Sequence, residues 1–435
     1  MFGVCGSSTR AANAWDERGA MPAGVAIDIV RSFGSLASMH AALDRIGMGM
    51  PCGIVARFPD RDTADVEAAI AFARHRFPVL QTRLAWPNGR PVLMDAGAAI
   101  PVRDRGTGPL LDFAVATDGE PWRYRLIRDG ADVWLQAVWL HAVADGLSML
   151  RFLHAVEASL AGASYQPSAR EPRRAERRRP LGTWLPGFLL DQQRDYVAMT
   201  SRSQAVAGTS WLVVPPATRD HVLGAANAAC GGGLGWLAAA AARAFGEQEG
   251  QARGDVLLNV PIARGDATAL GGFGFGVGSL RFPLRLRAGT PMADLAAEIA
   301  RRTRRAAATG WDRNLERLLG TDPARHARFA RIQAERTADP NITISWKGTH
   351  PAIGAHGARD IACFAAAPTL HVSAHADARG LSLSVTSHQS TGQRTLLLQR
   401  IADHLGCGDE RTTHALDAIG ASAGGTARAA AIDQA

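Results

Sequence analysis

The stretch Trp139-Leu140-His141-Ala142-Val143-Ala144-Asp145-Gly146 joins two segments of different periodicity and places a histidine between them. Residues 131–140 before it form a strand-like run, and residues 147–160 after it form an apolar run with helical spacing. A histidine held at a strand end by a nearby carboxylate is one way in which a fold builds a general base. The stretch therefore predicts a strand-to-helix junction that presents His141, with Asp145 close behind it.

The same residues also have an ordinary structural explanation. His141 can be a core histidine with satisfied hydrogen bonds, and Asp145 can cap the following helix, a role that aspartate favours. The position of His141 favours the functional interpretation, because a strand-to-helix junction fixes a side chain on a rigid scaffold while leaving it open to a cleft.

Length and composition limit the class of protein. At 435 residues the chain exceeds the usual size of a single core, so we expect two domains or subdomains. Its 47% hydrophobic and 20% charged residues are typical of a globular protein. No apolar run reaches the roughly 18 residues of a membrane span. The first twenty residues lack the basic start and apolar core of a secretory signal. We therefore expect a cytoplasmic protein without a membrane span.

The charge is strongly basic, with a net charge of +8 and a pI of about 10.0. Almost all of this charge is arginine, and one dense cluster consists of Arg170, Arg173, Arg174, Arg177, Arg178 and Arg179. Because the cluster lies among proline and serine without apolar periodicity, it predicts a solvated linker. The alternative is a contact for an acidic carrier protein or for the phosphates of coenzyme A. Nucleic acid is not predicted, since no aromatic interleaving accompanies the charge.

Other chemical motifs are absent or misplaced. The five cysteines are far apart and contain no C-x-x-C pair, so they predict buried small hydrophobic residues rather than disulfides or zinc ligands. His141 and Asp145 have no third ligand at a diagnostic spacing, so no metal site is predicted. The glycine runs at 231–235 and 271–278 match neither a dinucleotide fingerprint nor a P-loop. The G-x-S-x-G string at 420–424 has no histidine after it to act as base.

Strand-like and helix-like runs alternate in two halves of the chain. In the first half, a helix is predicted at 64–76, followed after Pro78 by strands at 79–86, 122–127 and 133–140. In the second half, strands are predicted at 212–214, 256–262, 279–286, 342–346, 370–374 and 381–386, and helices at 234–245, 292–305 and 394–405. Because no regular β-α repeat appears, the pattern favours an α+β fold.

The predicted domain organisation follows from these runs and from composition. It consists of a flexible N-terminus (1–25), an N-terminal subdomain (26–162), a basic linker (163–205), a C-terminal subdomain (206–410) and a flexible tail (411–435).

Three further segments carry a resemblance to a known family. The segment 75–84, H-R-F-P-V-L-Q-T-R-L, resembles a stretch found upstream of the histidine in the condensation-domain superfamily. The segment 259–264, N-V-P-I-A-R, is similar to a later strand of that superfamily, and 274–286, ending F-P-L-R-L, is similar to its crossover segment. With the H-x-x-x-D-G string at 141–146, these segments follow the family's order and spacing over most of residues 30–405.

The superfamily includes chloramphenicol acetyltransferase, nonribosomal-peptide condensation domains, polyketide-associated acyltransferases and plant alcohol acyltransferases. The resemblance implies two chloramphenicol-acetyltransferase-like α/β sandwich subdomains that form a V around a central active-site tunnel. Donor and acceptor would enter this tunnel from opposite faces.

The resemblance also implies roles for individual residues. His141 would be the general base, and the Gly146 backbone would approach the oxyanion and donate its N–H to it. Asp145 would be structural and would pair with an arginine, for which Arg264 is preferred over Arg285. Ser345, in the segment Ser345-Trp346-Lys347-Gly348, is either an oxyanion donor in a loop at the tunnel floor or, as we favour, an ordinary strand-end serine.

The sequence departs from the family at two points. Leu140 stands where many condensation domains carry a first histidine, which leaves the second, catalytic position occupied by His141. The D-F-G-W-G string of the plant branch is also absent.

The prediction is a stand-alone acyltransferase of specialised metabolism. It would move an acyl group from coenzyme A or a carrier-protein phosphopantetheine to a small-molecule alcohol or amine, without a metal, a tightly bound cofactor or a covalent acyl-enzyme. The length leaves no room for an adenylation or carrier domain, so a carrier protein would be a separate chain. Two alternatives remain: an amide-forming condensation enzyme with two carrier-bound substrates, and a catalytically silent binding module.

Overall fold

The structure is a computed structural model that describes the residues from 29 to 415 with internal gaps. The described residues are 29–32, 35–45, 51–95, 119–165, 208–248, 254–263, 273–287, 289–309, 320, 322, 324–326, 328, 342–365 and 370–415. The predicted N-terminal segment 1–25 and nearly all of the predicted basic linker lie outside this set.

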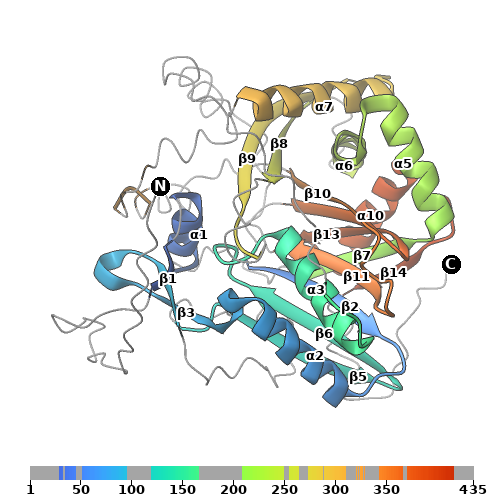
Figure 1. Ribbon diagram of the computed structural model, residues 1–435. Coiled ribbons are helices and arrows are strands. Elements are labelled where there is room, and N and C mark those ends of the chain that lie inside the picture. The colour runs from blue at the N-terminus through green and yellow to red at the C-terminus, as the bar shows by residue number, and fades with distance from the viewer. Residues whose placement is uncertain are drawn as a thin grey trace.

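The first half of the chain builds a four-stranded antiparallel sheet in the order β11-β2-β6-β5. Its strands are β2 (Cys52–Phe58), β5 (Trp122–Asp129), β6 (Asp132–Trp139) and β11 (Arg359–Ala365). Helices α2 (Thr63–Arg76) and α3 (Gly146–Leu160) pack against one face of this sheet (Figure 1). Most apolar residues at helical spacing in α2 and α3 are buried in the core between helices and sheet, as the periodicity predicts, whereas Phe72 of α2 is exposed.

A small antiparallel sheet in the order β1-β4-β3 lies beside this half. It is formed by β1 (Ile29–Ser32), β3 (Thr82–Ala85) and β4 (Val92–Asp95), and helix α1 (Ser35–Arg45) follows β1. The strand predicted at 79–86 is wrong over its first half, because residues Pro78–Gln81 form a 3₁₀ turn. Pro78 fixes the backbone at the start of that turn, and the Thr82 hydroxyl donates to the Val79 carbonyl at 2.7 Å to close it.

The second half builds a seven-stranded mixed sheet in the order β14-β7-β13-β12-β10-β8-β9. Its strands are β7 (Gly208–Val214), β8 (Gly254–Ala263), β9 (Val277–Leu286), β10 (Ile342–His350), β12 (Leu370–Asp377), β13 (Gly380–Ser387) and β14 (Thr412–Ala415). Helices α5 (Pro216–Cys230), α6 (Gly233–Gln248), α7 (Met292–Thr309) and α10 (Thr391–Leu405) complete this half. β10 runs parallel to both of its neighbours, and the other pairs are antiparallel.

The two faces of this sheet differ in polarity. The side chains that join the helix-covered core are apolar, and they include Ile342, Ile344, Leu370, Val372, Leu381, Leu383 and Val385. The alternate positions are polar: Thr343, Ser345 and Lys347 on β10, His371, Ser373 and His375 on β12, and Ser382, Ser384 and Thr386 on β13. We call this second set the polar face. The Ser384 hydroxyl donates to the Cys363 carbonyl of β11 at 2.6 Å, so the polar face lies against the first sheet.

β11 is the element that ties the halves together. It follows β10 in the chain but pairs with β2 of the first sheet, where Cys363 lies opposite Ile54. The division of the sequence at 206 is therefore not the division of the sheets. The predicted flexible tail also begins with an ordered strand, since β14 pairs with β7 and Thr413 lies opposite Leu212.

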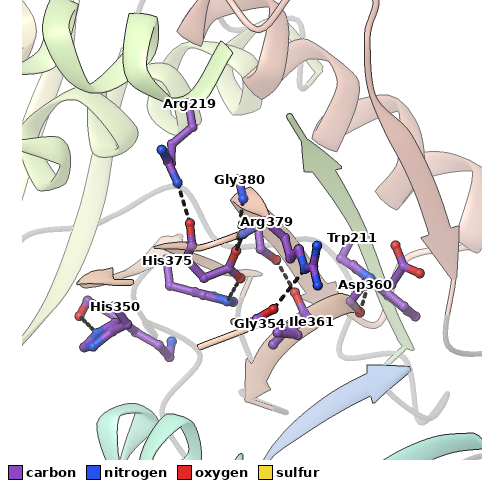
Figure 2. A network of polar contacts seen from close by, with 12 residues as sticks. Trp211, Arg219, His350, Gly354, Asp360, Ile361, His375, Arg379 and Gly380 are labelled. Atoms are coloured by element: carbon purple, nitrogen blue, oxygen red, sulfur yellow. Dashed lines mark hydrogen bonds and ion pairs between the residues drawn. The ribbon is translucent and has the colours of Figure 1, made fainter. Parts of the chain in front are cut away.

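A polar network fixes the turn between β12 and β13 next to the β10–β11 connection (Figure 2). The Asp377 carboxylate accepts the backbone N–H groups of Arg379 and Gly380, at 2.7 and 3.0 Å. Arg379 Nε donates to the Gly354 carbonyl at 2.9 Å, and Arg219 donates to the Asp377 carbonyl. The network therefore links the second sheet, α5 and the connection that leads into β11.

The α+β class and the two-subdomain organisation are confirmed. Sequence periodicity identified the helices and strands around the junction at 139–146, but it missed β1, α1, β2, β4, α5, β11 and β14. Four of the five cysteines are described, and all four are buried and free of disulfides. Within the described residues no single helix is long and apolar enough to cross a membrane. Helices α5 and α6 pass that test only as a pair bent by 96°.

Candidate functional site

His141 lies at the junction that the sequence predicts, between β6 and α3. Its Nδ1 lies 3.0 Å from the Ala144 carbonyl oxygen, and the Cys52 thiol donates to the same carbonyl at 3.3 Å. A carbonyl can only accept, so this contact requires the proton on Nδ1 and leaves the Nε2 lone pair available. His141 is a half-buried residue. Burial lowers the pKa of His141 below its usual 6.5, and Lys347 acts in the same direction against the Ala144 carbonyl and Asp145. The imidazole is therefore neutral at physiological pH.

Two rings flank His141. The His40 ring of α1 has its centroid 4.9 Å away, and the Phe275 ring lies 5.3 Å away in an edge-to-face arrangement. Both flanking residues are buried, and the Nδ1 atom of His40 has no hydrogen-bond partner among the described residues. Burial lowers the pKa of His40 well below 6.5, and His141 and Arg281 add to this effect. His40 thus contributes a neutral imidazole rather than a second positive charge.

Asp145 caps α3 and joins it to the segment before β9. Its carboxylate accepts the Ser148 N–H at 2.8 Å and, through the other oxygen, the Gly276 N–H at 3.2 Å. The Ser148 hydroxyl lies 2.9 Å from the carboxylate and accepts the Gly274 N–H at 2.9 Å. Asp145 is only 1% exposed. It therefore links the two halves of the protein through backbone groups.

The predicted arginine partner of Asp145 does not occur among the described residues. Arg264 lies outside them, and Arg285 is an exposed residue of β9 that is not in contact with the buried Asp145 carboxylate. Among the described residues, two backbone N–H groups bind the carboxylate oxygens, and the Ser148 hydroxyl lies 2.9 Å from one of them and 2.8 Å from the Gly274 carbonyl oxygen. The described donors come from a helix N-terminus and a neighbouring loop, and the pairing of Asp145 with Arg264 stays a prediction.

Gly146 is the first residue of α3, and its side-chain position is filled by Lys347. A Cβ at Gly146 would lie 2.3 Å from Lys347 Cε and 3.0 Å from Nζ. A larger residue at this position would require the end of the Lys347 side chain to move. The Gly146 N–H belongs to the unpaired first turn of α3 and has no acceptor among the described residues. This N–H lies on the loop that holds His141.

Lys347 projects from a β-bulge in β10. Between the pairs Trp346–Ala374 and Thr349–Ala376, β10 has two residues where β12 has one. Lys347 Nζ donates to the hydroxyls of Ser345, at 3.1 Å, and Ser373. Burial lowers the pKa of Lys347 from its usual 10.5. Ser345, which the sequence placed either at a tunnel floor or at a strand end, is thus a hydrogen-bond partner of a buried lysine.

His371 completes the polar surroundings of the site. It lies on β12 two residues before Ser373, and its Nδ1 is buried without a hydrogen-bond partner among the described residues. Burial lowers its pKa well below 6.5, and Lys347 and His141 add to the effect. Lys347 of the polar face packs against Gly146, so the polar face of the second sheet extends to the histidine loop.

Sequence reasoning found His141, Asp145, Gly146 and Ser345 but missed the contribution of Lys347, His40 and His371. The usable signal was the alternation T-x-S-x-K in β10 and H-x-S-x-H in β12, which places polar residues on one face of buried strands. The alternation does not identify the neighbours of that face, because these come from another sheet.

The arrangement combines a neutral base with several hydrogen-bond donors. His141 Nε2 can accept a proton, while the Gly146 N–H and Lys347 Nζ can donate to an oxygen. Such a set suits a reaction in which a nucleophile loses a proton while negative charge develops on a neighbouring oxygen.

No protein-family model matches the sequence, and no curated protein matches it. Solved structures do. The first condensation domain of the calcium-dependent antibiotic synthetase, in complex with a substrate analogue, is 19% identical with a TM-score of 0.62, over 90% of this chain and 98% of that one. Trichothecene 15-O-acetyltransferase from Fusarium sporotrichioides is 10% identical with a TM-score of 0.60, over 87% and 95%.

The epimerization domain from the third module of tyrocidine synthetase B is 14% identical with a TM-score of 0.57, over 94% of this chain and 99% of that one. At these identities the likeness establishes the fold. The three neighbours are named for different activities, so the reaction has to be argued from the site itself.

Proposed function

We propose that this chain, which has the two-subdomain fold of condensation domains and of an acetyltransferase, transfers an acyl group from a thioester to an alcohol or amine. His141 is the general base in this proposal. The donor is coenzyme A or a carrier-protein phosphopantetheine, and the acceptor is a small molecule of specialised metabolism.

The observation that carries the proposal is the hydrogen bond between His141 Nδ1 and the Ala144 carbonyl, at 3.0 Å. It leaves the lone pair on Nε2, and the lowered pKa of His141 keeps that lone pair free of a proton at physiological pH. A neutral and oriented imidazole is what general-base catalysis requires, and such proton transfer is worth about 10²–10⁴ in rate.

The reaction proceeds in two steps on a ternary complex. The acceptor oxygen or nitrogen forms a bond to the thioester carbonyl carbon, its proton moves to His141 Nε2, and the carbonyl π pair moves to the oxygen. The C–S bond then breaks as the carbonyl re-forms, and the departing thiolate takes the proton from the imidazolium. The Gly146 N–H donates to the oxyanion between these steps. Asp145 keeps the start of α3 in place through its bonds to Ser148 and Gly276.

The neighbours with this fold favour a thioester donor. A condensation domain and an acetyltransferase both join an acyl group to a nucleophile, and the site described above has the base for it. The amide-forming alternative, with two carrier-bound substrates, uses the same base and differs in its acceptor.

The test measures the release of free thiol from acetyl-coenzyme A and from acyl carrier proteins, with a panel of alcohols and amines. We expect turnover by the wild type and a loss of about 10²-fold or more in His141→Ala. Equal turnover by wild type and variant would overturn the proposal, as would the absence of thioester consumption with every donor and acceptor, which is the result expected of a silent binding module. Donor affinity that is insensitive to salt would argue against an acidic carrier protein.

A further inference from the structure

Lys347 is the only lysine in the 435-residue sequence, and every other residue in its Lys+Arg total of 48 is an arginine. The side chain of this single lysine is only 9% exposed. Arginine and lysine are not interchangeable in a buried site, because the ammonium is a compact point charge whose pKa shifts readily, whereas the guanidinium is broad and permanently charged. The one lysine of the chain is therefore a buried amine next to Gly146, on the loop that holds His141.

The buried charge has no ion-pair partner among the described residues. Nζ donates to two neutral hydroxyls, those of Ser345 and Ser373, and the Asp145 carboxylate favours the charged form of Lys347 only from beyond ion-pair distance. An ammonium has three N–H donors, so one of them is left over. An isolated buried charge is costly unless an anion joins it. The site therefore has a positive group and a spare donor that the folded protein does not use.

The position of the spare donor matches the place where an anion forms. Lys347 Nζ would lie 3.0 Å from a Cβ on Gly146, so it is close to the Gly146 backbone at the N-terminus of α3. A helix N-terminus favours negative charge, and its unpaired N–H groups point at it. His371, two residues from Ser373, adds a buried Nδ1 atom without a partner among the described residues. Lys347 of β10 thus lies next to Gly146 at the start of α3 and also contacts the Ser373 hydroxyl of β12.

We propose that Lys347 is a further catalytic residue of the acyl transfer, in which its Nζ donates a hydrogen bond to the oxyanion of the tetrahedral intermediate. The inference rests on the proposed function and adds a second donor to the Gly146 N–H. The carbonyl π pair moves to the oxygen as the acceptor attacks, Nζ–H donates to that oxygen, and the pair returns when the C–S bond breaks. Lys347 keeps its protons throughout, so His141 handles the only proton that moves.

The test compares the wild type with Lys347→Met, which keeps the length of the side chain and removes its donors. With acetyl-coenzyme A and the acceptor panel, we expect kcat to fall about 10²–10³-fold while KM changes by less than about threefold, as for loss of an oxyanion donor. Arg128→Met, at an exposed position of β5, serves as the matched control and is expected to keep wild-type kcat.

Chemical rescue separates the ammonium from a merely structural role. Lys347→Ala leaves a space that ethylammonium can enter, and we expect added ethylammonium chloride to restore kcat while ethanol does not. Unchanged kcat in Lys347→Met overturns the role of Lys347. An increase confined to KM also overturns it, because it would assign the lysine to binding an anionic substrate instead. If His141→Ala remains as active as the wild type, the proposed function fails, whatever Lys347→Met does.

A measurement on the wild-type protein tests the same role of Lys347 if the variants do not fold. Because the chain has one lysine, labelling with [ε-13C]lysine gives a single side-chain signal. The trifluoromethyl ketone analogue of acetyl-coenzyme A forms a tetrahedral adduct, and we expect it to shift this signal while coenzyme A alone does not. A signal that both compounds leave unchanged overturns the proposal.

Discussion

A buried ionisable side chain lies near each end of helix α3, and the two side chains differ in how fully they are hydrogen-bonded. Glu157, near its C-terminal end, is fully buried, and its two oxygens accept the N–H groups of Gly354 and Ala358, at 2.8 and 3.1 Å. Lys347, packed on the first residue of α3, bonds to two neutral hydroxyls and keeps a spare donor. Backbone N–H groups of the connection between β10 and β11 bind both oxygens of Glu157. One N–H donor of Lys347, by contrast, has no acceptor among the described residues.

The difference separates a structural charge from a functional one. A buried polar group with all its partners in place rigidifies the fold, whereas one with capacity left over costs stability and is retained for a reaction or a ligand. On this basis Glu157 holds the β10–β11 connection against α3. The spare donor of Lys347 is available to bind the oxyanion that forms during the proposed reaction. Four measurements test this comparison.

The largest expected effect is the loss of stability when Glu157 is replaced. Glu157→Ala removes the acceptor of two backbone N–H groups and leaves a cavity. Each buried donor left without a partner costs about 1–3 kcal/mol and the cavity adds to this cost, so we expect a loss of about 3 kcal/mol or more in the free energy of unfolding. Urea denaturation measures it. The exposed Glu298→Ala, which breaks a surface ion pair with Arg302, is the control and should cost less than about 1 kcal/mol. A similar loss of stability in Glu157→Ala and Glu298→Ala would contradict the structural role of Glu157.

The second effect is a pH dependence of Glu157. Burial raises its pKa to about 7 from 4.5, against the backbone N–H groups that lower it. The folded protein therefore holds a proton between these two values that the unfolded chain releases, and the stability this provides declines as the pH rises from about 4.5 to about 7. A shift of this size corresponds to on the order of 3 kcal/mol.

Glu157→Gln isolates this titration. At pH 5 we expect the variant to be less stable than the wild type by about 1–3 kcal/mol, because the amide NH₂ faces a backbone donor. By pH 8 the wild type has lost its proton, and the gap should narrow. Urea midpoints at pH 5, 6, 7 and 8 measure the gap, in which other titrating groups cancel. A gap that widens with pH contradicts the raised pKa.

The third effect tests the contact between Gly146 and Lys347. Gly146→Ala places a methyl group 2.3 Å from Lys347 Cε, and overpacking of this kind costs about 1–3 kcal/mol. In the Lys347→Ala background the same substitution should cost less, and a double-mutant cycle measures the coupling. Gly224→Ala is the matched control, since nothing lies within 4 Å of a Cβ at that exposed helical position, and it should stabilise by about 0.5–1 kcal/mol. Additive effects of the pair would argue against the contact.

The smallest expected effect concerns stability when the spare charge is removed. Lys347→Met should change the free energy of unfolding by less than about 1 kcal/mol, because the lost bonds to Ser345 and Ser373 are offset by the relief of a buried charge. Urea denaturation at pH 7 checks this. A loss as large as that of Glu157→Ala would mean that Lys347 is structural as well.

The sequence predicted the local part of this site and not the part that depends on distant strands. His141, Asp145 and Gly146 could be found because a strand, a cap and a helix follow one another within a short stretch. Their true partners could not be found. Gly276 reaches Asp145 from the segment before β9, and Lys347 reaches Gly146 from β10, and both contacts depend on how the two halves pack. The preferred arginine partner of Asp145, Arg264, lies outside the described residues, so that pairing stays a prediction.

For the fold, too, the sequence predicted local elements but not the pairing of distant strands. Periodicity located the buried helices α2, α3 and α6, whose apolar faces are continuous. It missed β11, whose sequence is R-D-I-A-C-F-A. Nothing in this sequence indicates that the partner of the strand is β2. The 3₁₀ turn at Pro78 was missed for a local reason, since the strand-like residues after it obscured the turn that proline and Thr82 form.

The pairing of β11 with β2 has a consequence for how the chain folds during synthesis. Cys363 pairs with Ile54, so one edge of β2 stays open until nearly the whole chain has left the ribosome. An open edge next to apolar core residues is a site for pairing with other chains. The nascent protein therefore depends on protection of this edge while the second half is made. Late-arriving long-range strands of this kind are also slow to dock. For the same reason, neither half expressed alone would contain a complete first sheet, and a truncation before residue 359 removes the strand that closes it.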